Sequence, residues 1–377
     1  MTPSRCSPRS TRWLAAALAG VALLLACGDN GTGPGPAKPM DPLATAANIQ
    51  DLDEIFTSPL FQSLGLASAY SPAATSPLGV LRTLLHTAQA TLGGRRTLSP
   101  RDAQRAALNL HAVLVPPSGP GAATILPPEL LGKTFEWDTV GFTGYIVTDR
   151  QDPDAPVDGV RFILYELDAF NSPILPLHEF AYADFKDESA ATQKLHVVIG
   201  AHAPVVIYLD YAITGTVTSA SSTASVAGYI TDGAIRRLDF DAAATSTAST
   251  YSLDIRFDVN AANAHARLKA TLTQPSANIV TVNEDLRLQF DAEVLTVTGS
   301  ETIDLNTFEE SGNVTVGVNG GIYATAAIAN GTPTFTGGGG QDLTPNDLVA
   351  LNAIYGAIGT VANRFGSLLA PGGSVGT

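Results

Sequence analysis

Four carboxylates, those of Asp149, Asp152, Asp154 and Asp158, lie within ten residues of the chain. Oxygen-rich loops of this kind suit Ca²⁺, which takes oxygen ligands from carboxylates and backbone carbonyls. Two prolines and an irregular spacing separate the four acids, so the stretch matches no known calcium loop. It therefore predicts a turn between two strands, with a calcium site as the alternative.

A second group of potential ligands combines one histidine with four acids: His178, Glu179, Asp184, Asp187 and Glu188. A metal site would need these side chains to converge, and nothing in their spacing fixes such a geometry. A solvated hairpin rim explains the same residues equally well. His196 stands among apolar residues of an expected strand, and we interpret it as a half-buried strand residue rather than a ligand or proton carrier.

Local catalytic motifs are absent from the sequence. It has no GxSxG, Walker A, HExxH, Rossmann glycine or EF-hand pattern. No two histidines have the four-residue spacing of a two-histidine zinc helix. Catalytic groups can still come from distant parts of a chain. An exported hydrolase with a dispersed site, for instance around residues 178–188, therefore remains one hypothesis.

The first residues read as an export signal. Arg5, Arg9 and Arg12 precede an apolar run from Trp13 to Ala26. This run is shorter than the about 20 apolar residues of a membrane helix, which is typical of a removable secretory signal. Its end, Leu24-Leu25-Ala26-Cys27, resembles the lipobox of bacterial lipoproteins. The resemblance implies that residues 1–26 are removed and that Cys27 becomes the acylated N-terminus.

The same resemblance implies an address. In Gram-negative lipoproteins an Asp directly after the acylated cysteine marks retention in the inner membrane, whereas Gly28 follows Cys27 here. We therefore expect a cell-envelope protein on the outer membrane of a Gram-negative bacterium, attached by its lipid, since stable anchoring takes more than one acyl chain. Cys6 would leave with the signal, so the mature chain would contain no disulfide.

The charge balance limits the partners. The chain has 21 Lys and Arg against 35 Asp and Glu, and removal of the three signal arginines leaves 18 against 35, a net charge of −17. Such a chain is poorly suited to bind nucleic acid or anionic surfaces through charge. Its hydrophobic content of 45% is that of a folded protein.

Composition divides the mature chain into four parts. A Gly/Pro-rich tether covers residues 27–42, and a helical region follows over residues 43–115, with further helices at 78–92 and 100–115. Residues 127–335 form the expected antiparallel β domain. The last part, residues 343–370, is an expected amphipathic helix that packs on this domain.

Alternation of apolar and polar residues marks the strands. It has no error over residues 251–260, and it recurs at 142–148, 160–167, 195–199, 205–218, 224–231 and 238–242. Residues 286–294 alternate and then slip by one residue before Leu295, which predicts a β-bulge in one bent strand.

Two turns are also predicted. Asp232-Gly233 is a typical tight-hairpin pair. At Asn319-Gly320-Gly321, a three-residue loop would pair Val318 with Ile322, and residues 316 and 314 with residues 324 and 326, all on one face.

The C-terminal helix has clear start signals, with Thr344 as N-cap, Pro345 at the first position and Asp347 at the third. Its apolar stripe, expected to be buried, comprises Leu348, Leu351, Tyr355, Ile358, Ala362, Phe365 and Leu369. Glycines 356 and 359 lie on the opposite face, and each costs about 1 kcal/mol relative to Ala in a helix. We expect something to pack closely against them.

These observations predict an α+β, mainly β fold, in which a large curved antiparallel meander, barrel or half-barrel, carries a C-terminal helix. In general plan this resembles envelope proteins with a half-barrel and helical lid that handle lipids or lipoproteins. The first hypothesis is a non-enzymatic lipoprotein that binds a lipid or other apolar ligand, lined by Leu351, Tyr355, Ile358 and Phe365. A structural or interaction lipoprotein with a packed core, a surface adhesin and the dispersed hydrolase are the alternatives.

Overall fold

A computed structural model of the chain describes residues 40–54, 125–126, 128–141, 145–168, 173–202, 205–218, 220–260, 263–276, 278–304, 306–307 and 309–375. The side chains of residues 50–54, 217 and 362–375 lie outside this description. So do the predicted signal with Cys27, nearly all of the tether, the predicted helices at 78–92 and 100–115, and the side chain of Phe365.

The described elements are mainly strands. The helices are α1 (Pro42–Glu54) and α5 (Pro345–Val375), with short 3-10 turns η3 (Pro128–Leu130) and η5 (Gly338–Gly340). The first eight strands are β1 (Lys133–Trp137), β2 (Tyr145–Val147), β3 (Gly159–Tyr165), β4 (Glu179–Asp187), β5 (Gln193–His202), β6 (Val205–Val217), β7 (Ser221–Thr231) and β8 (Arg236–Thr247). The others are β9 (Thr250–Val259), β10 (Ala264–Ser276), β11 (Ile279–Phe290), β12 (Glu293–Asp304), β13 (Glu310–Val318), β14 (Gly321–Ala329) and β15 (Thr332–Gly337).

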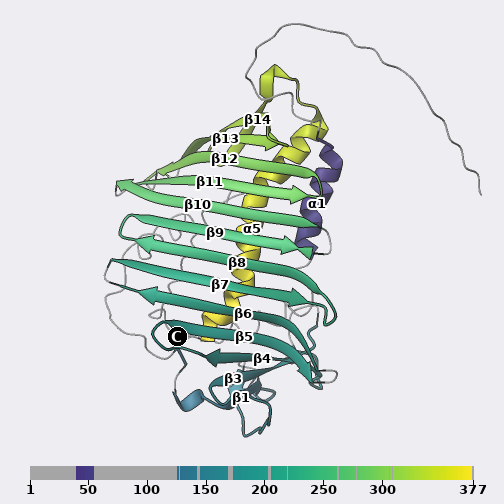
Figure 1. The fold of residues 1–377 in the computed structure, drawn as a ribbon, viewed down its shortest axis with the longest axis vertical. Helices are drawn as coiled ribbons and strands as arrows, with labels where there is room; N and C mark the ends of the chain where they lie inside the picture. Colours follow the sequence, from purple (N-terminus) through teal and green to yellow (C-terminus); the bar gives the residue numbers. More distant parts are fainter. Residues whose placement is uncertain are drawn as a thin grey trace, which may run out of the picture. The chain divides into compact units, whose positions relative to one another are not determined.

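All fifteen strands in the described part of the chain belong to one sheet. From β3 to β15 each strand pairs with its neighbour in the sequence, and β1 joins β3 in parallel and β2 in antiparallel orientation. The sheet is curved and does not close, because β15 and β2 are its two edges, and α5 runs across the successive strands (Figure 1). The predicted α+β, mainly β fold with a curved antiparallel meander is confirmed, in its half-barrel form.

Strict alternation gives this sheet two faces. In β9 the buried residues are Tyr251, Leu253, Ile255, Phe257 and Val259, while the intervening residues are more accessible. Neighbouring strands keep this phase in their pairing, so the buried side chains form one continuous face, which we call the inner face. Helix α5 packs on it and contacts β10, β12 and β15.

The predicted bulge near Leu295 is wrong. Residues 286–297 are not one bent strand but the end of β11 and the start of β12, joined by the two-residue turn Asp291-Ala292. Asp291 adopts a positive φ of 50°, which Asp tolerates better than most residues. The phase slip therefore marks a hairpin, in which the first residues of β12 resume the inward phase at Leu295.

The two predicted turns also need correction. Val318 pairs with Gly321 across a two-residue Asn319-Gly320 turn, whose φ values of 51° and 84° are both positive. A bulge after the turn then restores the predicted pairing of Val316 with Ala324. The Asp232-Gly233 hairpin instead has a four-residue loop, residues 232–235, because the Asp232 carboxylate accepts the backbone N–H groups of residues 234 and 235.

The start of α5 confirms the sequence signals. The Thr344 hydroxyl accepts the backbone N–H of Asp347 at 3.3 Å, and the Asp347 carboxylate accepts that of Thr344 at 2.7 Å. The buried stripe differs from the prediction, since Leu348 is exposed while Ala350 and Ile354 are buried. Nothing lies within 4 Å of a Cβ added at Gly356, so close packing does not explain that glycine.

Candidate functional site

Three adjacent rows of the inner face are almost entirely apolar. Each row crosses the sheet through directly paired residues, one from each strand. The central row comprises Leu195, Ile213, Val226, Ala242, Ile255, Leu268, Leu286, Val297, Val316 and Ala324. All ten residues are buried, with at most 5% of their surface exposed. The rows through Phe257 and Val259 continue this apolar surface toward one side of the sheet.

Buried polar side chains gather in the two rows on the other side. We call them the polar rim: Gln193, Ser222, Ser246, Tyr251, Glu284 and Glu301. Ser222 pairs with Ser246, and Ser246 with Tyr251, so these three hydroxyls occupy adjacent positions on neighbouring strands. Glu284 pairs with Gly299 and Glu301 with Val282, which makes the two acids diagonal neighbours on β11 and β12.

Helix α5 contacts this rim through Tyr355. Its phenol donates a hydrogen bond to Oε1 of Glu301 at 3.2 Å, and both residues are buried. Leu351, Ile354 and Ile358 of the same helix are fully buried. The predicted ligand-lining residues 351, 355 and 358 therefore lie together in the core that includes the inner face.

A second tyrosine holds the start of the helix. The Tyr323 hydroxyl of β14 donates to Oδ1 of Asp347 at 2.6 Å, and the other oxygen of Asp347 accepts from Thr344. Hydrogen bonds from Tyr323 and Thr344 lower the pKa of Asp347 below its ordinary value. Burial and the neighbouring carboxylate raise the pKa of Tyr323 to about 12. At neutral pH the pair is therefore a phenol donating to a carboxylate.

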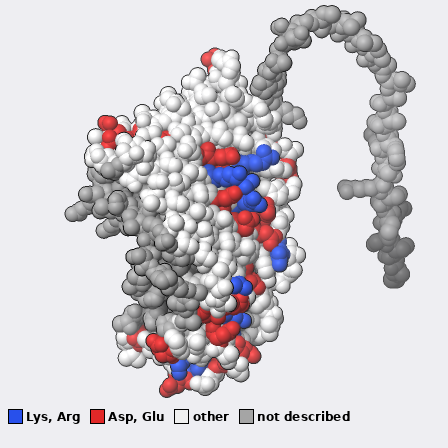
Figure 2. Space-filling view, turned by 60° about the vertical axis from the view of Figure 1, so that its left-hand side comes forward, with Lys and Arg blue, Asp and Glu red and all other residues white. Residues whose placement is uncertain are grey.

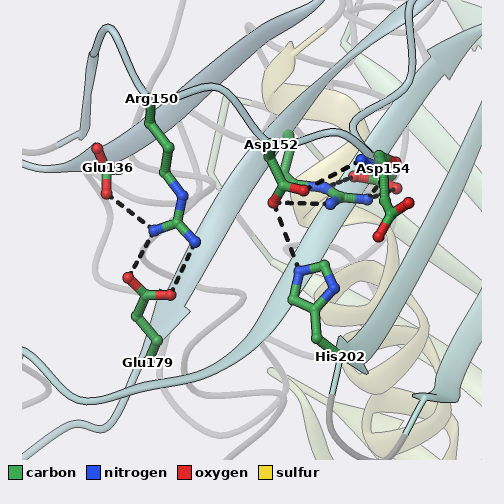
Figure 3. A network of polar contacts seen from close by, with 8 residues as sticks. Glu136, Arg150, Asp152, Asp154, Glu179 and His202 are labelled. Carbon is green, nitrogen blue, oxygen red and sulfur yellow. Dashed lines mark hydrogen bonds and ion pairs between the residues drawn. The ribbon is translucent and has the colours of Figure 1, made fainter.

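The β3–β4 end of the sheet holds a separate polar network (Figure 3). Arg161 of β3 is buried, and its Nε and one terminal nitrogen donate to both oxygens of Asp184 at 2.7 and 2.8 Å. Its other terminal nitrogen lies 2.9 Å from Oδ2 of Asp152. Burial disfavours the charged guanidinium, but the hydrogen bonds and charges of these two acids outweigh it and raise the pKa of Arg161.

Aromatic and imidazole rings border this network. The guanidinium carbon of Arg161 lies 4.1 Å from the ring centre of Tyr182. The ring centres of Tyr182 and His202 are 4.6 Å apart. Nε2 of His202 is 3.6 Å from the Asp152 carboxylate. Beside them, Arg150 bridges Glu136 and Glu179, the latter through two hydrogen bonds (Figure 3). These contacts tie the 149–158 loop to the strands.

The predicted calcium residues take different roles. Asp152 binds Arg161, and Asp154 contributes its backbone carbonyl to the same guanidinium. Asp149 and Asp158 are exposed. Among the residues that the structure describes, no three His, Cys, Asp or Glu side chains are placed to hold a metal ion. The calcium alternative stays a prediction without support from this geometry.

The acids at 184–188 also have separate partners. Asp187 accepts the backbone N–H groups of residues 125 and 126, and Glu188 binds Lys194. His196 lies between Oε1 of Glu188 at 3.0 Å and Oδ1 of Asp210 at 2.8 Å. This half-buried position on β5 fits the interpretation of His196 as a strand residue. Both ring nitrogens donate to these acids only in the imidazolium form.

Sequence reasoning missed Arg161, Glu284 and Glu301. Glu284 stands in phase with the inward residues Val282 and Leu286, and Glu301 in phase with Val297. An acid at an inward position of an alternating strand is itself a signal, since isolated charges are costly to bury. Arg161 gave no such signal, because a charge between the apolar residues 160 and 162 reads as an outward position of an alternating strand, whereas every residue of β3 is buried.

Comparison with known proteins adds no family: no family model, no curated protein and no solved structure matches the chain. Within the described part of the chain, neither helix is long and apolar enough to cross a membrane.

Proposed function

We propose that the protein is a non-enzymatic cell-envelope lipoprotein that binds an amphiphilic lipid on the inner face, beneath α5. The observation that carries this proposal is the distribution of buried polarity on the sheet. Three rows are almost entirely apolar, with the Tyr211 hydroxyl as an exception in the row through Phe257, and the other buried polar side chains of strands β5 to β13 lie in the two rows of the rim. Ligand sites are typically apolar surfaces with a few polar groups that fix orientation.

The chemistry of the polar rim limits the chemical class of the ligand. An acyl chain suits the central rows, while carboxyl, hydroxyl and amide groups of the rim suit a polar end. Because Glu284 and Glu301 are acidic, we expect a neutral or cationic head with hydrogen-bond donors, such as an amine or a sugar, rather than a free fatty acid. The hydrogen bonds from Tyr323 to Asp347 and from Tyr355 to Glu301 would hold α5 over the ligand.

Anchoring belongs to the same proposal. The lipobox resemblance assigns the lipid to Cys27 and the protein to the outer membrane. A Cys27→Ser variant is expected to leave the membrane fraction and remain in the soluble fraction of the envelope. Membrane retention of this variant, with the signal still cleaved, would contradict lipid anchoring and leave ligand binding untouched.

The binding site is tested by two neighbouring acids on β11. Glu284 is buried on the inner face, whereas Asp285 points to the exposed face. The full chain, stripped of lipid by organic extraction and returned to detergent micelles, is titrated with fluorescent phosphatidylethanolamine. Glu284→Gln is expected to weaken binding about tenfold, and Asp285→Asn to leave it unchanged.

Three results would contradict the proposal. Equal binding by both variants would place the lipid elsewhere. Absence of binding by the folded wild-type chain would favour the structural or interaction lipoprotein with a packed core. Hydrolysis of the probe would favour the exported hydrolase.

A further inference from the structure

The hydroxyl of Tyr251 is an inward polar group that none of the contacts described above explains. Tyr251 lies on β9 in the polar rim and is only 1% exposed. Among the residues that the structure describes, its hydroxyl has no hydrogen-bond partner. Buried polar side chains nearly always have a partner, because an unpaired buried hydroxyl is costly. The phenol therefore points to a partner from outside the chain, either a ligand or a buried water.

The neighbours of Tyr251 on the inner face are short or apolar. On the adjacent strands it pairs directly with Ser246 and Leu272. Toward the central row its diagonal neighbours are Ala244 and Ala270, whose side chains are single methyl groups. Strand side chains stand roughly perpendicular to their sheet. The phenol therefore extends past these methyl groups, toward the side of the sheet on which the lipid is proposed to lie.

The phenol is also separate from the acids of the rim. Along its own row, Leu272 and Val282 lie between Tyr251 and Glu301. Glu301 is three strands away, roughly 14 Å at ordinary strand spacing, and it accepts its hydrogen bond from Tyr355. A ligand that meets both the phenol and the acids needs two polar groups at some distance from each other.

The missing partner is an uncharged acceptor. Burial raises the pKa of Tyr251, so its hydroxyl stays protonated and can donate. An anionic acceptor would need a cation beside it, and within the described part of the chain Arg161, at the β3–β4 end, is the only buried Lys or Arg. Figure 2 shows other Lys and Arg side chains on the surface of the molecule, in a band with Asp and Glu. A carbonyl oxygen is the uncharged acceptor that acyl lipids carry.

We infer that Tyr251 donates a hydrogen bond to an acyl carbonyl of the bound lipid, so that the ligand is an acyl ester or amide rather than an ether lipid or a hydrocarbon. This inference rests on the lipid binding proposed above. It fits a lipid such as phosphatidylethanolamine, whose amine balances its own phosphate. The amine would lie at Glu284 and Glu301, and an acyl carbonyl, one glycerol unit further along, at Tyr251.

The test compares two lipids that differ only at this carbonyl. Unlabelled diacyl phosphatidylethanolamine and its dialkyl ether analogue, of equal chain length, compete with phosphatidylethanolamine labelled in its acyl chain for the full chain in detergent micelles. The wild type should bind the ester about fivefold more tightly, as one buried hydrogen bond contributes. Tyr251→Phe keeps the ring and lacks the donor, so it should bind the two lipids equally.

Tyr229→Phe is the matched control, and a second measurement needs no lipid. Tyr229 lies on the exposed side of β7, where its hydroxyl donates to Asp210 at 3.5 Å. Its loss should leave the ester preference unchanged. In the lipid-free state, Tyr251→Phe should melt at or above the wild-type temperature, because it removes a buried hydroxyl that has no partner.

The failures of this inference and of the proposed function are distinguishable. Equal binding of the two lipids by the wild type, or an unchanged ester preference in Tyr251→Phe, would overturn the inference and assign the hydroxyl to a buried water, while lipid binding itself would stand. A lower melting temperature of lipid-free Tyr251→Phe would also overturn it, since the hydroxyl would then have a partner within the chain. Binding of neither lipid by the folded wild type would contradict the proposed function, and this inference with it.

Discussion

The β3–β4 end and the inner face beneath α5 both bury ionisable side chains, but they arrange them differently. At the β3–β4 end, one guanidinium is surrounded by the carboxylates of Asp152 and Asp184 and by a backbone carbonyl. On the inner face, Glu284 and Glu301 are diagonal neighbours along one side of an apolar surface, and Glu301 accepts a hydrogen bond from Tyr355. The first arrangement fastens a loop to strands, and the second has the profile of a ligand site.

The largest expected effect is at Arg161. Arg161→Met leaves the buried Asp184 carboxylate without its partner, and breaking such a pair costs about 3–5 kcal/mol. Chemical denaturation monitored by circular dichroism would measure the loss. Combining Arg161→Met with Asp184→Leu and Asp152→Asn removes the stranded charges and should recover more than half of it. If the combined variant is the less stable of the two, the network is more than a structural fastening.

Packing of α5 comes next. Leu351 is fully buried against the core, and its replacement by Ala removes buried methyl groups and leaves a cavity, at a cost of about 2–5 kcal/mol. Leu348 on the same helix is exposed, so Leu348→Ala should change the free energy of unfolding by less than about 0.5 kcal/mol. Similar losses in the two variants would mean that the helix does not pack through the stripe described above.

The hydrogen bond between Tyr355 and Glu301 provides a third test of the inner face. Tyr355→Phe removes the hydrogen bond to Glu301 and should destabilise the protein by about 1–3 kcal/mol, because a buried carboxylate loses a donor. The effect should vanish in a Glu301→Leu background, which has no acceptor for the phenol, if the two groups act as a pair, and a double-mutant cycle measures this coupling. Additive losses would contradict the contact.

The smallest effect concerns pH at the start of α5. Asp347 has a lowered pKa in the folded protein, so its contribution is fully present above the ordinary value of 3.8 and is lost as the pH falls below it. Asp347→Asn should cost about 1 kcal/mol at neutral pH and flatten the stability profile between neutral and acidic pH. An unchanged acid limb in thermal melts of Asp347→Asn would show that other carboxylates determine it.

The sequence predicted the fold class because strand alternation depends on local residue types. It predicted the capped start of α5 for the same reason, since Thr344, Pro345 and Asp347 lie within four residues. It failed at Asn319, because a two-residue turn followed by a bulge gives the same pairing of Val316 with Ala324 as the predicted three-residue loop. It failed at Asp291, because a hairpin turn shifts the hydrophobic phase in the same way as a bulge. At both residues the backbone φ, which is positive, distinguishes the alternatives. It also failed at Leu348, because the rotation of α5 depends on where the sheet lies.

The candidate site was predictable in part. Leu351, Tyr355 and Ile358 were named from helical spacing alone, and they do lie on the buried side of α5. The hydrogen-bond partner of Tyr355 was not predicted, because Glu301 is 54 residues away in the sequence and only the register of the sheet brings it to the helix. The same register aligns the polar rim, whose residues are scattered through the sequence and come together only when the strands pair.

The central claim is that the inner face holds an amphiphilic lipid. The most direct measurement is native mass spectrometry of the full chain, isolated from its own envelope in mild detergent, with lipids then extracted and identified. We predict one lipid per chain with a neutral or cationic head, and its loss in Glu284→Gln but not in Asp285→Asn. A folded wild-type chain that carries only the acyl groups on Cys27 would contradict the account.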